Sequence, residues 1–393
     1  MNIIIKIFLL SVILNLNVIS FHANADESKI YWAGVGFMGK WKDRDILYKH
    51  SSSMLCSAKS ECINGNINKM AFSRLANKDY DNFLLEKTGT ELGSVEGIVM
   101  ALGILREEIG ITEDKVLGQK QFQHVYRLYG SIIFFEYGEG RVILSIPVVV
   151  QYTDYLDHIA SDEEQLEIIK NLYSNDEGLN FFDELYKLAK KAKPDAISLK
   201  YTQITKVNLG ESVLEVLDTK VEKVFGEQVA QILESQLVAK SNISLVPSAI
   251  GHNVVGSKIT ATFADASREL LIPEAQYKIE FDVRGFKKFE SVKGKQKTVC
   301  FAVGTTLKIK DPFDDEMLNI RFARTKRACT VAAIEKEYDP LFYFPQSLFS
   351  LINNISSQFS ENGPSKEYLI EAAPKTKDAF EQIISVKKEI ENF

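Results

Sequence analysis

The sequence predicts an α/β or α+β fold of two domains, each a mixed sheet with β-hairpins packed by amphipathic helices. Two β-rich runs, 123–137 and 141–155, are joined by a Gly-Glu-Gly loop suited to a hairpin. An apolar helical stripe extends from Glu211 to Lys240. Beyond residue 195 a strand, a helix, a strand, a helix and a meander follow one another, which is the order of a sheet covered by helices.

The first 25 residues predict a secretory signal peptide. Lys6 precedes an apolar run from Ile7 to Phe21, and Ala23-Asn24-Ala25 supplies a small-x-small cleavage pattern. The alternative is an uncleaved anchor helix, for which the run is short. We expect a mature protein without a transmembrane span, exported to the periplasm or secreted.

The remaining chain divides, by this prediction, into an N-terminal domain (26–194), a C-terminal domain (195–340) and C-terminal helices (341–393). In the first domain we expect a strand from Ile30 to Phe37 and a helix from Glu91 to Glu108, followed by the hairpin. Pro147 predicts an edge strand or a bulge. Ser161 with Glu164 predicts a capping box at the start of an acidic helix, and a second helix ends before Pro194.

Four cysteines in an exported chain predict two disulfides. Cys56 and Cys62 lie close together in a polar stretch and can close a small loop. Cys300 and Cys329 flank two β-rich runs. Free or differently paired thiols are the alternative. No C-x-x-C occurs, so neither zinc binding nor thioredoxin-type chemistry is indicated.

The second disulfide follows from hairpin register. A hairpin centred between Asp314 and Asp315 places Cys300 opposite Cys329, and directly opposed residues lie within disulfide reach. The same register pairs Leu307 with Phe322 and Ile309 with Ile320. Spacing and register therefore both favour a hairpin closed by Cys300–Cys329.

Residues 197–331 resemble the small α/β domain of the curli-secretion lipoproteins and of the amino-terminal part of TolB. The resemblance rests on "FGEQVAQILESQLVAKSNISLVP", "LLIPEAQYKIEFDVRGFKKFE" and "VGTTLKIKDPFDDEMLNIRFART". The first strand here alternates polar and apolar residues, and a lipidation cysteine is absent. The resemblance implies a scaffold or assembly role in a cell envelope and transfers no catalytic residue.

Gly34, Gly36 and Gly39 form a G-x-G-x-x-G pattern after the first predicted strand. A dinucleotide site also needs a helix opening at this loop and an acidic residue about 20 positions on. Neither is present, so we interpret the glycines as a strand and turn and expect no cofactor. The histidines lack metal-ligand spacing, and no P-loop or G-x-S-x-G occurs. No metal site or catalytic residue is assigned.

Charge is segregated along the chain. Its net charge is -6, which gives no reason to expect nucleic acid as a partner. Residues 284–327 nevertheless carry twelve basic side chains against five acidic ones, while residues 154–187 carry ten acidic against two basic. The basic segment could receive an acidic partner. Alternatively the two segments face each other, or lysines protect strand edges.

We therefore expect an exported, soluble scaffold or assembly protein of a bacterial-type envelope that acts by protein–protein contact on an envelope protein or an anionic envelope polymer. The alternatives are a secreted hydrolase with an unrecognised site and a secreted host-directed binding factor, and whether the chain is an enzyme stays open. The candidate contact residues combine basic side chains of the C-terminal hairpin with the two tryptophans, which could also form a packed corner: Arg321, Arg324, Arg327, Lys308, Lys310, Trp32 and Trp41.

Overall fold

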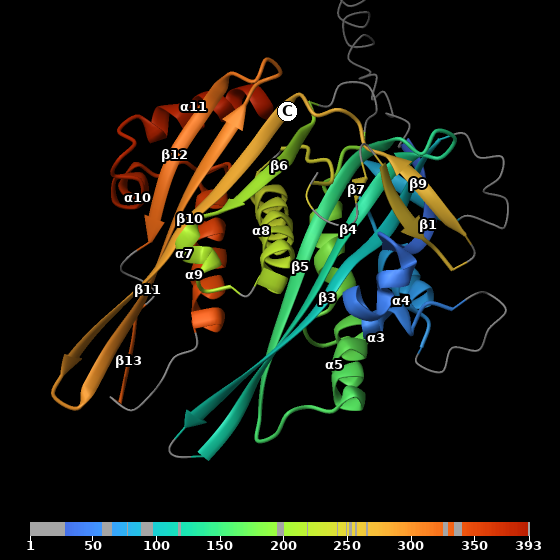
Figure 1. Ribbon diagram of the computed structural model, residues 1–393. Helices are drawn as coiled ribbons and strands as arrows, with labels where there is room; N and C mark the ends of the chain where they lie inside the picture. The colour runs from blue at the N-terminus through green and yellow to red at the C-terminus, as the bar shows by residue number, and fades with distance from the viewer. Residues whose placement is uncertain are drawn as a thin grey trace, which may run out of the picture.

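An eight-stranded mixed sheet forms one half of the molecule (Figure 1). The computed structural model describes residues 28–56, 65–76, 78–87, 97–116, 119–194, 200–217, 219–241, 243–248, 250, 254–255, 258–264, 266–324, 329–333 and 340–391. The strand order is β5-β4-β3-β1-β8-β7, with β2 paired to β1 and β9 to β8. The strands are β1 (Ser28–Met38), β2 (Phe83–Lys87), β3 (Ile98–Val116), β4 (Gln119–Glu136), β5 (Val142–Leu156), β7 (Val254–Val255), β8 (Lys258–Thr262) and β9 (Ser267–Leu271).

The first sheet draws on both halves of the sequence. β1 is parallel to β2 and β3, whereas the β3–β4 and β4–β5 pairs are antiparallel. The C-terminal part of β1 pairs with β8, so residues 254–271 return to the sheet that the N-terminal strands build. The domain boundaries given above stay a prediction.

Short helices cover one face of this sheet. They are η1 (Trp41–Asp43), α2 (Arg44–Leu47), α3 (Lys49–Ser52), α4 (Ile67–Leu75), α5 (Asp162–Ser174) and α6 (Phe181–Ala189). Large side chains such as Phe83, Phe134 and Phe181 fill the core between these helices and the sheet. The predicted capping box is present: the Ser161 hydroxyl accepts from the Glu164 amide, and the Glu164 carboxylate accepts from the Ser161 amide.

A second sheet, with order β12-β11-β10-β6 and β13 paired to β11, forms the other half. Its strands are β6 (Thr202–Leu209), β10 (Tyr277–Lys293), β11 (Gln296–Lys310), β12 (Glu316–Arg324) and β13 (Cys329–Ala333). The helices beside it are α7 (Glu211–Leu214), α8 (Thr219–Lys240), α9 (Pro340–Ser357), α10 (Lys366–Ala372) and α11 (Ala379–Ile390). The predicted fold class, mixed sheets with hairpins packed by helices, is confirmed.

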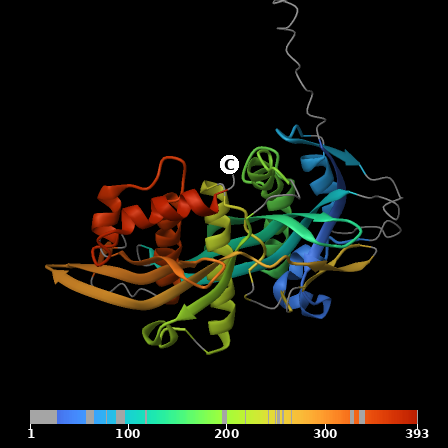
Figure 2. The same cartoon turned by 90° about the horizontal axis from the view of Figure 1, so that it is seen from above.

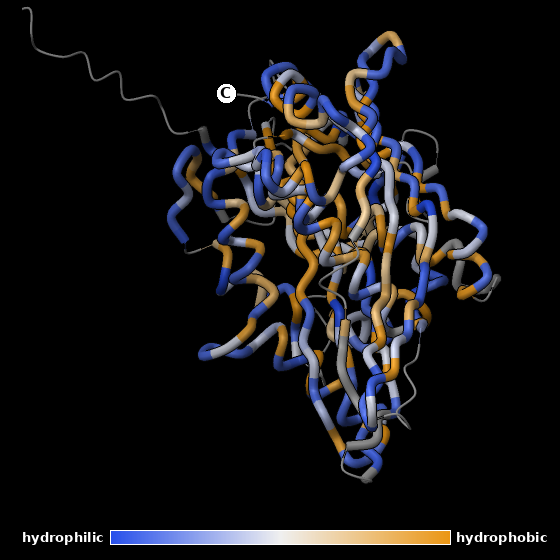
Figure 3. Tube along the Cα trace, turned by 90° about the vertical axis from the view of Figure 1, so that its left-hand side faces the viewer, coloured by the Kyte–Doolittle hydropathy of each residue, from blue (hydrophilic) through white to orange (hydrophobic). Residues whose placement is uncertain are grey.

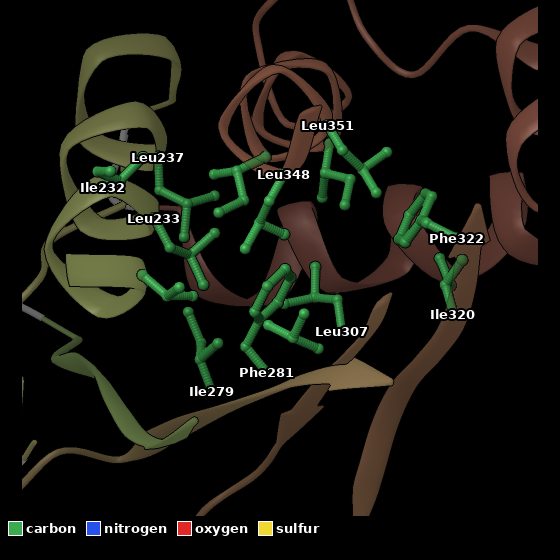
Figure 4. Packing of buried hydrophobic residues seen from close by; sticks show 14 of the residues in the cluster. Ile232, Leu233, Leu237, Ile279, Phe281, Leu307, Ile320, Phe322, Leu348 and Leu351 are labelled. Carbon is green, nitrogen blue, oxygen red and sulfur yellow. The ribbon is translucent and has the colours of Figure 1, made fainter. Parts of the chain in front are cut away.

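The core of the second half lies between the sheet and two of these helices (Figure 4). Leu233 and Leu237 of α8 and Leu348 of α9 point toward Phe281 and Leu307 of the sheet. Because inward-facing residues alternate along each strand, one face of the sheet is apolar and the other carries charges. In Figure 3 the hydrophobic segments accordingly gather in the middle of the molecule and the hydrophilic ones at its periphery.

The predicted helix from Glu91 to Glu108 is wrong over its described part. Residues 98–108 belong to β3, and residues 91–96 lie outside the described residues. β3 is buried on both faces where Val99, Met100 and Leu102 lie. A strand covered on both faces is apolar without alternation, so its sequence cannot be told from a buried helix by periodicity.

The predicted hairpin register needs a similar correction. Leu307 pairs with Ile320 and Ile309 with Leu318, two residues away from the expected partners. The chain turns over Asp311–Asp315, where Asp314 has φ +66, and the register shifts just before this turn, between Ile309 and Lys310. The shift is an even number, so the same side chains still face the core. Closer to the cysteines the expected pairing is correct, because β11 and β13 pair Cys300 with Cys329.

Other local predictions are confirmed. β4 and β5 form the hairpin across Gly138–Gly140, and Pro147 lies in β5, an edge strand of its sheet. The single helix predicted over Glu211–Lys240 is correct only in part, because α7 and α8 are separate helices and residues 215–217 between them are not helical.

Candidate functional site

The predicted basic contact residues on the outer face of the second sheet are largely engaged with acidic neighbours. Lys308 Nζ lies 3.5 Å from Asp282 Oδ2, and Lys310 Nζ lies 2.7 Å from Glu280 Oε1. These are cross-strand pairs between β10 and β11. Lys308 and Lys310 therefore balance charge within the sheet rather than offering an unpaired basic surface.

Arg321 is exposed on β12, opposite Thr306. Its neighbour Arg284 donates to the carbonyls of Thr305 and Phe322, and burial, with repulsion from Arg321, lowers the pKa of Arg284. Arg324 ends β12, and Arg327 lies outside the described residues. Of the three arginines named in the sequence analysis, Arg321 alone has a described side chain at the surface.

The two tryptophans have different environments. Trp32 is 6% exposed and belongs to the core beneath the first sheet, so it is not available to a partner. Trp41 is half-buried, with its ring against Phe37 and Tyr48 and with the Arg44 guanidinium 5.3 Å from its centroid. Of the two interpretations of the tryptophans, a contact surface or a packed corner, both side chains have the packing contacts of the second.

The Cys300–Cys329 disulfide is present, with a Cα–Cα distance of 4.0 Å. Cys56 is also disulfide-bonded, and its expected partner Cys62 lies outside the described residues. The Cys300–Cys329 bond ties β13 to β11 at the base of a projecting hairpin. It therefore fixes β13 to β11, the strand that continues into the projecting hairpin.

We call residues 287–297, the far end of the β10–β11 hairpin, the distal hairpin. Figures 1 and 2 show it extending beyond the helices of its half. The last covered layer is Phe286 and Phe301, which stack on Phe344 and Tyr343 of α9. Every residue from 287 to 296 is exposed, although the strands pair regularly up to Lys293 and Gln296. Gly294 turns the chain with φ +63.

The distal hairpin combines exposed apolar side chains with positive charge. Phe289 is 45% exposed and Val292 61% exposed. It contains five lysines against one glutamate: Lys287, Lys288, Lys293, Lys295, Lys297 and Glu290. Lys287 lies over the Phe289 ring, and Lys288 pairs with Glu290 at 2.6 Å. These lysines belong to the basic segment 284–327 noted in the sequence. No pattern in the sequence distinguishes Phe289 from an aromatic residue of the core.

The glycine pattern of β1 lies beside a cavity of about 380 Å³. One edge of β1 pairs with β3 over residues 34–37. On the other edge β2 pairs with residues 28–32 and β8 with residues 37–38, and on that edge no described strand pairs with residues 33–36. The Val35 amide donates instead to Asn68 Oδ1 at 2.7 Å. Gly34 has φ +97 and lies close to Asn68. The Phe263 ring packs against Gly36, where a Cβ atom would lie only 3.0 Å from it.

We call this cavity the β1 pocket. Its apolar walls include Val35, Phe135, Tyr137 and Phe263. Arg268 on β9 lies over the Tyr137 ring, 4.1 Å from its centroid, and donates to the Tyr137 hydroxyl. Asn66 and Asn68, at the start of α4, also line it. The sequence analysis singled out the neighbouring glycines but none of these residues, because they come from four separate segments.

His50, Ser51 and Glu107 include the residue types of a hydrolase triad, but their geometry differs from one. The Ser51 hydroxyl donates to Glu107 Oε2 at 2.7 Å and not to a histidine. Glu107 also accepts from the His50 and Ser51 amides. All three side chains are buried, so substrate cannot reach the hydroxyl. This cluster anchors α3 to β3 and supplies no nucleophile.

Among the residues that the structure describes, no group of three or more His, Cys, Asp or Glu side chains is arranged to hold a metal ion. His158 is exposed between Asp157 and Glu164, and hydrogen bonds to these two carboxylates raise its pKa. Nor does any described helix have the length and apolar character needed to cross a membrane.

No protein-family model matches the sequence, and no curated protein matches it. Among solved structures, a Helicobacter pylori protein named as a neuraminyllactose-binding hemagglutinin homolog is similar to 38% of this chain over 80% of its own length, with 9% identity and a TM-score of 0.22. A similarity at this level carries no inference about function. The resemblance of residues 197–331 to envelope assembly proteins stays a prediction.

Proposed function

We propose that this chain is an exported scaffold or assembly protein of a bacterial-type cell envelope, and that it binds a partner protein through the distal hairpin. The observation that carries the proposal is a regular, disulfide-anchored hairpin whose residues 287–296 are exposed on both faces. A β-hairpin that leaves its own core adds no burial to the fold, so its conformation serves something other than packing.

The composition of the distal hairpin supports a protein contact. Phe289 offers an aromatic anchor of the kind that dominates binding energy in interfaces, and Val292 adds apolar area. The surrounding lysines favour a partner surface that is acidic, and such complementarity speeds encounter and sets orientation. The Cys300–Cys329 bond holds β13 against β11 before binding, which lowers the entropy that a contact with these strands must offset.

Export is part of the proposal. The predicted signal segment and the disulfides both favour an oxidising compartment. A scaffold of the envelope should be retained in the periplasm, where its partner lies. A secreted host-directed factor should instead leave the cell. Fractionation decides between them: we expect the chain in the periplasmic fraction, and recovery mainly from the medium would favour the secreted factor.

Site-specific photo-cross-linking tests the contact itself. A photoreactive phenylalanine analogue at Phe289 should yield covalent adducts with a defined envelope protein. The matched control is the same analogue at Ile370 on α10, which is 74% exposed and far from the hairpin along the chain. Adducts that are identical from both positions, or absent from Phe289, would contradict the proposal.

Charge reversal provides a second test of the same surface. Changing Lys287, Lys288 and Lys293 to Glu should reduce the Phe289 adduct at least about tenfold, since like charges would then face an acidic partner. Exposed lysines elsewhere give a control of equal charge change: Lys375→Glu, Lys377→Glu and Lys388→Glu. If both triple variants lose the adduct equally, net charge and not the hairpin determines binding.

A further inference from the structure

We infer that the β1 pocket binds a small molecule in which a ring carries a carboxylate. The pocket lies in the other half of the molecule from the distal hairpin and does not depend on the proposed protein contact. Its volume of about 380 Å³ falls in the range of small-molecule sites, which is roughly 300–1,000 Å³. It remains open although aromatic side chains surround it.

The polar groups that line the pocket are hydrogen-bond donors. Asn68 Oδ1 accepts from the Val35 amide, and Asn66 Oδ1 accepts from the Lys69 amide as the N-cap of α4. Each acceptor atom is therefore engaged with the backbone. The NH₂ group is the end of each amide that stays available to the cavity. Both asparagines thus favour a ligand that presents acceptors.

Arg268 adds the charge. Its contacts are the Tyr137 ring and hydroxyl, and within the described part of the chain no carboxylate pairs with it. A guanidinium held by stacking presents its remaining N–H groups in one plane, which suits the two oxygens of a carboxylate. The stacking contact also positions this cation before a ligand arrives.

The charge count favours a carboxylate over a phosphate. The lining residues supply one positive charge and no negative one. A carboxylate balances that charge with a single negative charge, whereas a phosphate monoester carries about -1.5 to -2 at pH 7. With a phosphate, part of the negative charge would stay unbalanced in a pocket whose walls are largely apolar. Burying an unbalanced charge there costs free energy.

The apolar walls indicate what the carboxylate is attached to. Phe135, Tyr137 and Phe263 come from β4, its following turn and the β8–β9 connection, and together present ring surfaces to one cavity. Ring faces accept either an aromatic ring by stacking or the C–H face of a cyclic sugar. The ligand class is therefore a ring acid, with an aromatic acid and a sugar acid as its two sources.

Titration of the purified chain followed by NMR tests the inference, with benzoate and glucuronate as probes and benzamide and glucose as their neutral counterparts. We expect saturable binding of one acid and at least tenfold weaker binding of its neutral counterpart, because an ionic hydrogen bond is lost. The acid that binds identifies the source. No saturable binding of either acid up to roughly 10 mM would overturn the inference, as would inorganic phosphate binding as tightly as the ring acid.

Two substitutions locate the binding in the pocket. Arg268→Gln removes the charge, and Asn68→Asp keeps an oxygen for the Val35 amide while replacing the exposed donor with a negative acceptor. Each should weaken binding at least about tenfold. Lys258→Gln is the matched control, since Lys258 pairs with Glu269 outside the pocket on the neighbouring strand. Equal affinity in the Arg268 and Lys258 variants would place the site elsewhere.

Discussion

Ion pairs occur in two contrasting regions on either side of the second sheet. On its outer face Lys308 and Asp282 form a partly exposed pair, with side chains 29% and 21% accessible. On the far side of α8, where that helix packs on the first sheet, Arg106 and Glu227 form a pair that is 7% and 4% accessible. We call this second region the α8 interface.

The two regions show that the contribution of an ion pair to the stability of the fold depends on its exposure to water. At the outer face water screens both partners, so a pair adds little net stability. At the α8 interface both charges have been removed from water, and each depends on the other for compensation. Glu108 is held similarly, since it accepts from Arg127 and Tyr129. The buried region is thus the one that a single substitution should damage.

Removing one member of the buried pair should have the largest effect. Arg106→Ala leaves the Glu227 carboxylate without its guanidinium in a buried site. We expect the free energy of unfolding at pH 7 to fall by about 3–5 kcal/mol. Urea unfolding followed by circular dichroism measures the change.

A double variant checks the physical reason for that loss. Arg106→Met combined with Glu227→Leu removes both charges and keeps most of the volume, so its stability should lie much closer to that of the original chain. A single-variant loss below about 1 kcal/mol would mean that water reaches the pair and that the two regions do not differ.

The second prediction concerns Glu234, a buried carboxyl at the α8 interface for which the described residues supply no ion-pair partner. Burial raises its pKa to about 8, although hydrogen bonds from Ser248 act in the opposite direction. It borders a small cavity whose other lining residues are uncharged. Among the residues that the structure describes, none forms a hydrogen bond with its Oε1 atom. The folded chain therefore keeps a proton on Glu234 that the unfolded chain releases above its ordinary pKa of 4.5.

The sign of the pH effect follows from this difference. Between pH 4.5 and about 8 the folded state binds more protons than the unfolded state, so stability should fall as the pH rises. The slope is at most about 1.4 kcal/mol per pH unit. Glu234→Gln mimics the protonated side chain and should remove this component. Chemical unfolding of both proteins at pH 5, 6, 7 and 8 (roughly unit steps across the window) tests it, and parallel pH profiles would show that Glu234 does not titrate there.

The α8 interface also marks where sequence reasoning stops. The apolar stripe of α8 was predicted, and Phe225, Val229 and Leu233 are in the core. On its opposite face Glu227, Gln231 and Glu234 are also buried, and nothing in the stripe predicted this. A periodic pattern identifies the apolar face of a helix and gives no sign that a second sheet covers the polar one.

The charged run from Arg106 to Glu108 has the same explanation. The helical prediction rested on the apolar residues before this run and assigned these three charged residues no role. In β3 successive side chains point to opposite faces, so Arg106 and Glu108 reach the α8 interface and Glu107 reaches α3. Each partner lies more than 15 residues away in sequence, a distance that local patterns do not encode. The disulfide was predicted correctly although the hairpin register was not: β12 pairs with β11 two residues away from the expected register, and Cys300 meets Cys329 because a further strand, β13, pairs with β11.

The last prediction concerns the outer face, where we expect the smallest change in the free energy of unfolding. Lys308→Ala removes the partner of Asp282, which still accepts a hydrogen bond from Asn208 at 2.5 Å. We expect the free energy of unfolding to change by no more than about 1 kcal/mol, and that change should shrink as salt is raised because exposed pairs are screened. Urea unfolding at low and at high salt measures both quantities. A loss comparable to that of Arg106→Ala, unaffected by salt, would mean that Lys308 is as well shielded from water as the α8 interface, and burial would then no longer separate the two regions.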